Sequence, residues 1–216
     1  REMIVIIDNL LELAYACLTD EIASHFTDVQ VTNVSRGEEI PPITANIDGA
    51  LITGSSASVC EISQNLWIDS KKGVVQDLIK HEIPTLGICF GHQIINAALG
   101  GTVEHKSLMA GLVEVDLDDV PLFDGVESVA PVLHGDHVTT IGDPMERIGI
   151  APHCHIFATK HRSAPVWTVQ YHPELTPEIA TDRIEPDSGW DTHRLNYADS
   201  TAIRTFINFQ QVTVEK

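Results

Sequence analysis

The sequence predicts an α/β fold: a doubly wound, mostly parallel central sheet with helices on both faces and a small antiparallel β extension. Over the first hundred residues, apolar runs typical of strands buried on both faces alternate with segments of helical periodicity. After Gly100-Gly101 the segments become shorter and richer in β-forming residues. The length of 216 residues favours one domain, residues 1–216.

The first half is expected to alternate strands with helices. The expected strands are Met3–Asp8, Val29–Val34, Asp48–Thr53 and Pro84–Ile88, and the expected helices are Leu11–Phe26, Asn65–His81 and a third that begins after Cys89. Parallel strands end at one edge of a sheet, so we expect a functional site at their carboxyl ends.

The second half is expected to add strands that are partly antiparallel. These are Val113–Leu117, Ser128–Leu133, Arg147–Ala151, Ile156–Thr159 and Val166–Tyr171. A helix is expected to begin near Thr176, and a last helix, Ala198–Gln210, offers Ile203, Phe206, Ile207 and Phe209 for packing.

The charge balance is strongly acidic. Thirty-one acidic and 13 basic residues give a formal charge of −18. Such a surface repels phosphates, so no nucleic acid partner is expected. The acidic residues are spread along the chain rather than gathered in a tail, which suggests the hydrated surface of a protein from a salt-loving host.

The sequence also argues against membrane insertion, export, a disulfide framework and a zinc site. No apolar run approaches the roughly 20 residues that a membrane span needs, and no charged-then-apolar leader is present, so a cytoplasmic protein is expected. Cys17, Cys60, Cys89 and Cys154 lie far apart without a CxxC pair, which predicts free thiols rather than disulfides or a zinc site. Arg1-Glu2 can be native or foreign to the chain.

The segment Gly87-Ile-Cys-Phe-Gly91 predicts a nucleophile elbow with Cys89 at its tip. The sharp turn from strand to helix crowds the backbone, which explains glycine on both sides of the cysteine. The positive end of the helix dipole favours a thiolate. A buried, inert cysteine is the alternative.

A thiolate nucleophile needs a base, and His172 is the best candidate. It follows an apolar strand that is expected to end at the same edge of the sheet as the elbow. Glu174 lies two residues further on and can hold the second imidazole nitrogen. The alternative is a surface or capping histidine. Cys89, His172 and Glu174 are therefore the predicted catalytic triad.

Gly-Ile-Cys-Phe-Gly-His-Gln and Gln-Tyr-His-Pro-Glu together resemble the class I, triad-type glutamine amidotransferases, from Met3 to about Pro177. Within that family, Met-Ile-Val-Ile-Ile-Asp-Asn and the length look most like the separate glutaminase subunit of archaeal GMP synthase. The resemblance implies that Cys89 attacks glutamine, forming a thioester that water hydrolyses to glutamate. It implies no cofactor or metal, and an ATP-dependent synthetase partner for the ammonia.

The resemblance also assigns binding roles. The backbone N–H groups of Phe90 and Ser55 would form the oxyanion hole, with Gly54 in the same loop. Gln93 would grip the amino-acid end of glutamine; the alternative is a surface glutamine. Gly135 and Asp136 would meet the charged groups of the substrate through their backbone, while the side chains of His134 and Asp136 are expected to be structural.

Five stretches depart from the resemblance or stand outside it. Leu10–Leu13 and Met109–Gly111 differ from the pattern of the GMP synthase glutaminases on surfaces toward the synthetase, which bears on the acceptor of the ammonia. In the predicted oxyanion loop, residues 53–59, Ser55 replaces a glycine of that pattern and Ser56 a proline, which would make the loop stiffer. His153 and His155 could face one way on a strand as a metal pair, but no third ligand is evident. The segment 185–197 can be a lid, a docking patch or a solvated loop.

Two other functions remain open from the sequence. A γ-glutamyl hydrolase would use the same triad on a glutamine conjugate. A non-catalytic binding module would keep the fold without the reaction, but it would have no need of an intact Cys89, His172 and Glu174.

Overall fold

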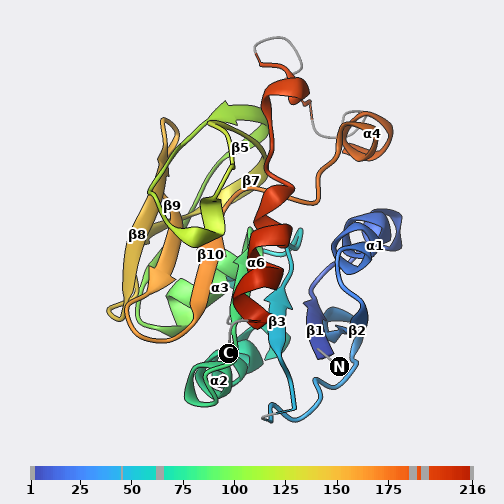
Figure 1. Ribbon diagram of the computed structural model, residues 1–216, viewed down its shortest axis with the longest axis vertical. Helices are drawn as coiled ribbons and strands as arrows, with labels where there is room; N and C mark the ends of the chain where they lie inside the picture. Colours follow the sequence, from blue (N-terminus) through green and yellow to red (C-terminus); the bar gives the residue numbers. More distant parts are fainter. Residues whose placement is uncertain (1–2, 45, 62–65, 185–188, 191–194, 215–216) are drawn as a thin grey trace.

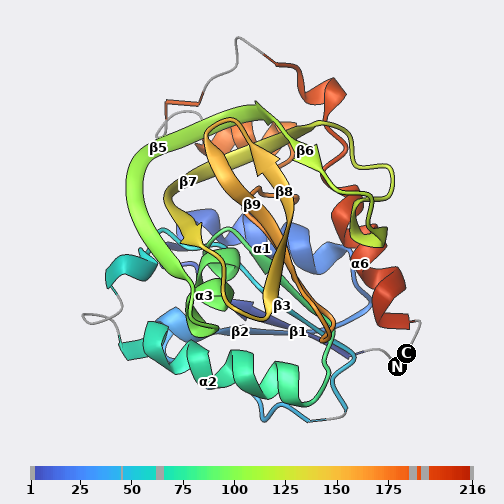
Figure 2. The same cartoon turned by 90° about the vertical axis from the view of Figure 1, so that its left-hand side faces the viewer.

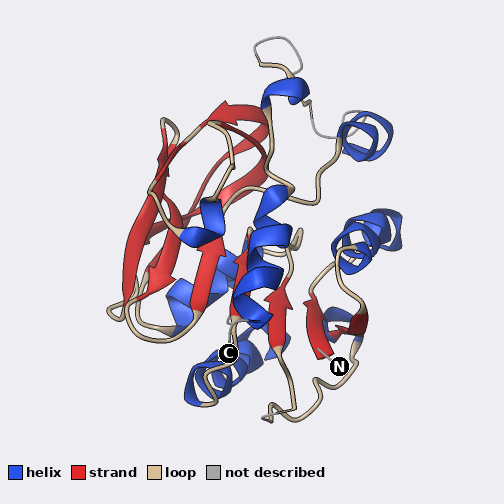
Figure 3. Ribbon diagram, in the orientation of Figure 1, coloured by secondary structure: helices blue, strands red, loops and turns tan. Residues whose placement is uncertain are grey.

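An eight-stranded sheet in the order β2-β1-β3-β4-β10-β9-β8-β6 forms the centre of the protein (Figures 1 and 3). The computed structural model describes residues 3–44, 46–61, 66–184, 189–190 and 195–214. The parallel strands are β1 (Met3–Asp8), β2 (Asp28–Asn33), β3 (Gly49–Ile52), β4 (Thr85–Ile88) and β10 (Val166–Val169). The antiparallel ones are β9 (Cys154–His161), β8 (Met145–Ala151) and β6 (Asp116–Leu117). The predicted mostly parallel sheet with an antiparallel extension is confirmed.

Helices cover both faces of the parallel part because residues along each strand point alternately to opposite sides. Ile4 and Ile6 of β1 pack in the cluster that holds the apolar side chains of α1 (Ala16–Ser24) and α6 (Arg204–Val214). Val5 and Ile7 pack in the cluster of α2 (Leu66–Lys80) and α3 (Phe90–Ala98). Figure 2 shows α1 and α2 on opposite sides of β1 and β2.

A separate antiparallel pair, β5 (Thr102–Glu114) and β7 (Val129–Thr140), lies beside β8 and β9 (Figure 2). Both strands are longer than predicted. The first part of β5 is mostly exposed and polar, so it has no apolar alternation to signal a strand. The second part of β7, from His134 on, is polar although much of it is buried. Its polar side chains are explained by the site described below.

Several predicted boundaries are wrong. Residues 11–12 form no helix, and Leu13–Tyr15 is only a 3-10 turn, so Leu11 and Leu13 are exposed. The last helix begins at Arg204 instead of Ala198, and Ile207 points outward while Phe206 and Phe209 are buried. The helix predicted near Thr176 is a short α4 (Pro177–Ile179), capped by the Thr176 hydroxyl and followed by a π-helical turn, Ala180–Ile184.

Two predictions fall largely outside the described residues. Arg1-Glu2 is one, and residues 185–188 and 191–194 of the segment 185–197 are the other. Trp190, which is described, is only 7% exposed and stacks on Tyr197, so the segment is not solvated at that point. Within the described part of the chain, no helix combines the length and apolar character that crossing a membrane would require.

Candidate active site

Cys89 lies at the tip of a sharp turn between β4 and α3. Its φ is 52° and its ψ is −102°, and a positive φ is uncommon in residues other than glycine. A strained backbone of this kind costs about 1–3 kcal/mol and persists where its surroundings fix it. Here the Cys89 N–H donates to the Val169 carbonyl oxygen at 2.8 Å. The geometry agrees with the predicted elbow.

The two glycines around Cys89 are required by close backbone contacts. A Cβ on Gly87 would lie 2.7 Å from the carbonyl oxygen of Gly91 and from Cδ1 of Ile95. A Cβ on Gly91 would overlap the carbonyl oxygen of Ile52 in the neighbouring strand β3. Any larger residue would therefore push α3 away from the sheet.

His172 reaches the same edge of the sheet because β10 is the parallel neighbour of β4. Val169 lies opposite Ile88, so the chain segments that carry Cys89 and His172 leave the sheet side by side. His172 Nδ1 lies 2.7 Å from Oε1 of Glu174, and both side chains are buried. The structure thus brings the three predicted triad residues together.

Both nitrogens of the His172 ring face hydrogen-bond acceptors. Nδ1 faces the Glu174 carboxylate, and Nε2 lies 3.3 Å from the carbonyl oxygen of Leu133. Only the doubly protonated ring can donate to both. Burial by itself lowers the pKa of His172, but the charges of Glu174 and Cys89, with hydrogen bonds to both, outweigh it and hold that pKa well above its usual value.

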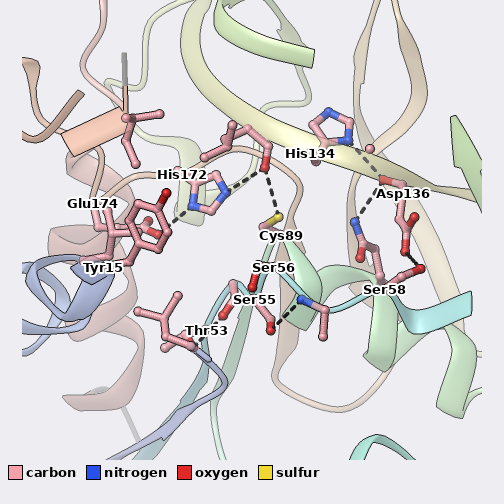
Figure 4. Close-up of a pocket in the computed structure, with 18 of the residues that line it drawn as sticks. Tyr15, Thr53, Ser55, Ser56, Ser58, Cys89, His134, Asp136, His172 and Glu174 are labelled. Atoms are coloured by element: carbon pink, nitrogen blue, oxygen red, sulfur yellow. Dashed lines mark hydrogen bonds and ion pairs between the residues drawn. The ribbon is translucent and has the colours of Figure 1, made fainter. Parts of the chain in front are cut away.

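The Leu133 carbonyl is a part of the site that the sequence did not reveal. Cys89 Sγ lies 3.7 Å from this oxygen, which also faces His172. It is a backbone group of β7, and no side-chain pattern signals where a carbonyl points. Through these two contacts it lies between the imidazole of His172 and the thiol of Cys89, which Figure 4 shows side by side.

Gly54 makes room for the imidazole. A Cβ at this position would lie 2.9 Å from Cε1 of His172 and 3.6 Å from Cβ of Cys89. The neighbouring Ser55 donates its hydroxyl to the carbonyl oxygen of Asn9 at 2.7 Å and accepts from the Ala57 N–H at 3.1 Å. The predicted oxyanion loop is therefore fixed next to Cys89, while Phe90 on the other side begins α3.

Gln93 is held by its amide nitrogen. Nε2 donates to the backbone carbonyl oxygen of Asp136 at 2.9 Å and to Oε1 of Gln170 at 3.3 Å. This leaves Oε1 of Gln93 as the polar atom that can accept from an ammonium group. Gln93 is 3% exposed, so the alternative of a surface glutamine is wrong.

The carboxylate of Asp136 holds the loop 53–59, in which the oxyanion hole is predicted. Oδ2 accepts from the Ser58 hydroxyl at 2.5 Å and from the Val59 N–H at 3.1 Å, and Oδ1 lies 2.8 Å from Nδ1 of His105. Through these contacts the Asp136 side chain joins β7 to the loop and to His105 in β5. Ser58 was missed because it contacts a residue 78 positions away.

A cavity of about 400 Å³ joins these residues. Its lining includes Cys89, His172, Glu174, Gly54, Ser55, Gln93, Gly135 and Asp136, which are all the predicted site residues except Phe90. In Figure 4, Asp136 and Ser58 lie on one side of Cys89, and Glu174 and Tyr15 lie on the other. None of the described residues that line the cavity is lysine or arginine.

Comparison with known proteins agrees with this arrangement. The family model for glutamine amidotransferase class-I matches residues 5–190. The chain belongs to the class-I glutamine amidotransferase family. A curated relative from Methanothermobacter thermautotrophicus is one of the subunits of a glutamine-hydrolyzing GMP synthase. It is 37% identical over 106 residues, which are 47% of this chain and 56% of the relative.

A second relative is a glutamine-hydrolyzing GMP synthase from Clostridium novyi. It is 29% identical over 142 residues, and the match covers 63% of this amidotransferase but only 28% of the relative. A solved glutamine amidotransferase from Thermotoga maritima superimposes with a TM-score of 0.77 at 16% identity, over 100% of this chain and 99% of that one. This likeness confirms the predicted fold.

Two departures of this amidotransferase from the GMP synthase pattern contact each other. Ser56 donates its hydroxyl to the carboxylate oxygens of Glu12, at 2.8 and 3.0 Å. Ser56 belongs to the predicted oxyanion loop, and Glu12 belongs to the unusual segment Leu10–Leu13. The unusual segment therefore touches the loop next to the nucleophile.

His153 and His155, considered above as a pair of metal ligands, do not point to the same side. His153 lies in the turn before β9, and its Nε2 is 3.0 Å from Nε2 of His134. His155 instead contacts Arg147. Burial lowers the pKa of His134 to about 3, so its ring is neutral and its Nδ1–H donates to the Asp136 carbonyl oxygen at 3.0 Å. Among the described residues, no three His, Cys, Asp or Glu form a metal-binding group.

Proposed function

We propose that this amidotransferase hydrolyses the side-chain amide of glutamine and passes the ammonia to a partner synthetase. One observation carries the proposal: Cys89, His172 and Glu174 lie together at the wall of a cavity that also holds Gln93. A buried nucleophile, an imidazole and an orienting carboxylate are the parts that acyl transfer from an amide needs.

In the proposed reaction the Cys89 thiolate attacks the amide carbon of glutamine. The backbone N–H groups of Phe90 and Ser55 stabilise the negative oxygen that forms. His172 then gives the proton on Nε2 to the leaving nitrogen, so that ammonia departs and a γ-glutamyl thioester remains on Cys89. Water, deprotonated by the now neutral His172, hydrolyses the thioester to glutamate.

The substrate would bind with its amino-acid end on the side of Gln93. The Oε1 atom of Gln93 can accept from the ammonium group of glutamine, and the backbone of Gly135 and Asp136 lies on the same side of the cavity. The reaction needs side chains, backbone amides and water only, so no cofactor or metal enters the proposal.

A synthetase partner is supported by the relatives whose names contain GMP synthase. The matched part of this chain spans about half the length of one relative and less than a third of the other. The relatives therefore do not fix the substrate that accepts the ammonia. We propose an ATP-dependent synthetase that aminates its substrate, with GMP synthase as the first candidate. Ammonia is readily protonated in water, which favours transfer inside a complex.

The test measures glutamate release from glutamine by the wild type and by Cys89→Ala, alone and with an ATPase that aminates XMP. Cys89→Ala should abolish release, and activation by the ATPase should identify GMP synthase as the activity. No turnover with any candidate synthetase, together with no labelling of Cys89 by an electrophilic glutamine analogue, would refute the proposal.

A γ-glutamyl hydrolase is the second candidate, and one observation favours it. The lining of the cavity includes apolar side chains besides the reacting groups, among them Leu10, Leu18 and Ile22. A hydrolase that acts on γ-glutamyl amides would use this space for the amine part of its substrate. Comparison of kcat/KM for glutamine and for γ-glutamyl alkylamides separates the two candidates.

A further inference from the structure

A series of hydrogen bonds outside the reacting groups ends at Gln93, the residue that is proposed to bind the ammonium group of glutamine. It begins at His153, in the turn before β9, whose Nε2 lies 3.0 Å from Nε2 of His134. His134 Nδ1 lies 3.0 Å from the carbonyl oxygen of Asp136. The same oxygen accepts from Nε2 of Gln93 at 2.9 Å. One ring and one backbone carbonyl therefore connect His153 to Gln93.

The direction of each bond follows from what its atoms can donate or accept. A carbonyl oxygen only accepts hydrogen bonds, so His134 must carry a hydrogen on Nδ1. A neutral imidazole carries one N–H, which leaves Nε2 of His134 as an acceptor. The hydrogen between the two rings must therefore belong to Nε2 of His153. Without that donor, Nε2 of His134 would be an unpaired acceptor in a ring that is 4% exposed.

A third histidine makes a positive charge on this pair unfavourable. The ring centroids of His134 and His137 lie 4.6 Å apart, and those of His137 and His153 lie 5.9 Å apart. His137 is also 4% exposed. Burial lowers the pKa of all three rings. The rings are therefore neutral near pH 7, and the positions of their hydrogens set the directions of the bonds.

These bonds matter for binding because they fix the direction of the Gln93 amide. An amide can present either its oxygen or its nitrogen to a neighbour. The Asp136 carbonyl oxygen and Oε1 of Gln170 both accept from Nε2 of Gln93, so its own Oε1 is the atom that can accept from an ammonium group. A His134 ring with its hydrogen on Nε2 would set a lone pair of Nδ1 against the Asp136 oxygen. Repulsion would then displace the carbonyl that holds Gln93.

We propose that His153 is a positioning residue for glutamine, which fixes the Nδ1–H form of His134 and thereby the amide of Gln93. The inference rests on the proposed function and deepens it, because it adds a residue to the binding of the substrate's ammonium group. His153 is not among the described residues that line the cavity. It therefore acts on the substrate only through the ring of His134, the Asp136 carbonyl and Gln93.

Two variants separate the hydrogen bond of His153 from its packing. His153→Phe keeps an aromatic ring for the contact with Phe157, whose ring centroid lies 6.0 Å away, but this ring has no N–H. His153→Gln is the matched control. The amide nitrogen of glutamine is as many bonds from Cβ as Nε2 of histidine, and it can donate to His134.

The first measurement is the position of the hydrogen on His134. Nuclear magnetic resonance of ¹⁵N distinguishes ring nitrogens with and without a hydrogen, and it needs no turnover. The wild type and His153→Gln should show the Nδ1–H form of His134, whereas His153→Phe should shift the ring toward the Nε2–H form. The Nε2–H form in the wild type would overturn the proposal, as would an unchanged Nδ1–H form in His153→Phe.

The second measurement compares glutamine with glutaramate, which is the same amide without the ammonium group. The loss of one hydrogen bond to the ammonium should raise KM for glutamine about five-fold in His153→Phe, with kcat unchanged. KM for glutaramate should be the same in His153→Phe and the wild type, because this substrate has no group for Gln93 to accept from. His153→Gln should match the wild type with both substrates.

Equal KM values for glutamine in the wild type and His153→Phe would overturn the proposal, and so would an equal rise with both substrates. The same holds if His153→Gln loses as much as His153→Phe, since a packing effect would then explain both. Failure of the proposed function looks different: neither amide would be hydrolysed by any of the proteins, and an electrophilic glutamine analogue would not label Cys89.

Discussion

Replacing Gly54 with alanine tests whether steric room for the imidazole sets the activity. The added Cβ would lie 2.9 Å from Cε1 of His172, whereas ordinary contacts begin near 3.4 Å, so the ring would have to retreat by about 0.5 Å. His172 cannot turn away freely, because its side-chain Nδ1 is bound to Glu174. Its backbone N–H also donates to the Pro131 carbonyl oxygen at 2.9 Å. The retreat of the ring therefore changes the distance between the imidazole of His172 and the thiol of Cys89.

The size of the effect follows from this displacement. A catalytic group misplaced by about 1 Å costs roughly a hundred-fold in rate. A displacement of about half that distance predicts a fall in kcat/KM on the order of ten-fold. The assay is glutamate release from glutamine, with the partner that supports turnover if one is needed. The rate at which an electrophilic glutamine analogue labels Cys89 gives an independent measure.

Gly73→Ala is the matched control. Gly73 lies in α2, and a Cβ there would meet nothing within 4 Å. Activity should be unchanged, and the free energy of unfolding should rise by about 0.5–1 kcal/mol because alanine favours helix. Wild-type kcat/KM in Gly54→Ala would refute the steric argument, as would an equal loss of activity in Gly73→Ala.

Two further predictions concern charge. Glu174→Gln removes the charge that most raises the pKa of His172, so NMR should find a lower imidazole pKa in this variant than in the wild type; equal values would contradict that cause. Because the folded pKa is raised, the stabilisation by protonated His172 is complete below about pH 6.5 and is lost as pH rises through the folded value, which urea unfolding at several pH values can follow. Asp136→Ala should lower stability by about 1–3 kcal/mol by releasing Ser58, whereas Asp136→Asn can still accept from Ser58 and should lose less. Similar unfolding midpoints for the alanine and asparagine variants would argue against this role.

The central sheet and the meeting of Cys89, His172 and Glu174 could be predicted because their signals are local. Runs such as Ile4–Ile7 are apolar on both faces, and Gly87 and Gly91 mark the turn at Cys89. His172 could be placed beside Cys89 because each follows the end of an apolar strand. Parallel pairing of β4 and β10 then brings the two together.

Other parts of the site could not be predicted, because they depend on contacts between distant segments. The Leu133 carbonyl oxygen faces both Cys89 and His172, but any residue type supplies a carbonyl. The exposed beginning of β5 pairs with β7 through backbone hydrogen bonds, and its polar side chains do not alternate.

The contact between Glu12 and Ser56 changes the meaning of two sequence departures. Considered separately, serine in place of glycine and proline changes the stiffness of the loop 53–59, and an acidic residue in Leu10–Leu13 alters a surface. The structure makes them partners, because the Ser56 hydroxyl gives the loop a hydrogen bond that proline cannot donate. Leu11 and Leu13, 41% and 73% exposed, flank Glu12. Any change in the position of Glu12 would therefore reach the loop beside Cys89 through this hydrogen bond.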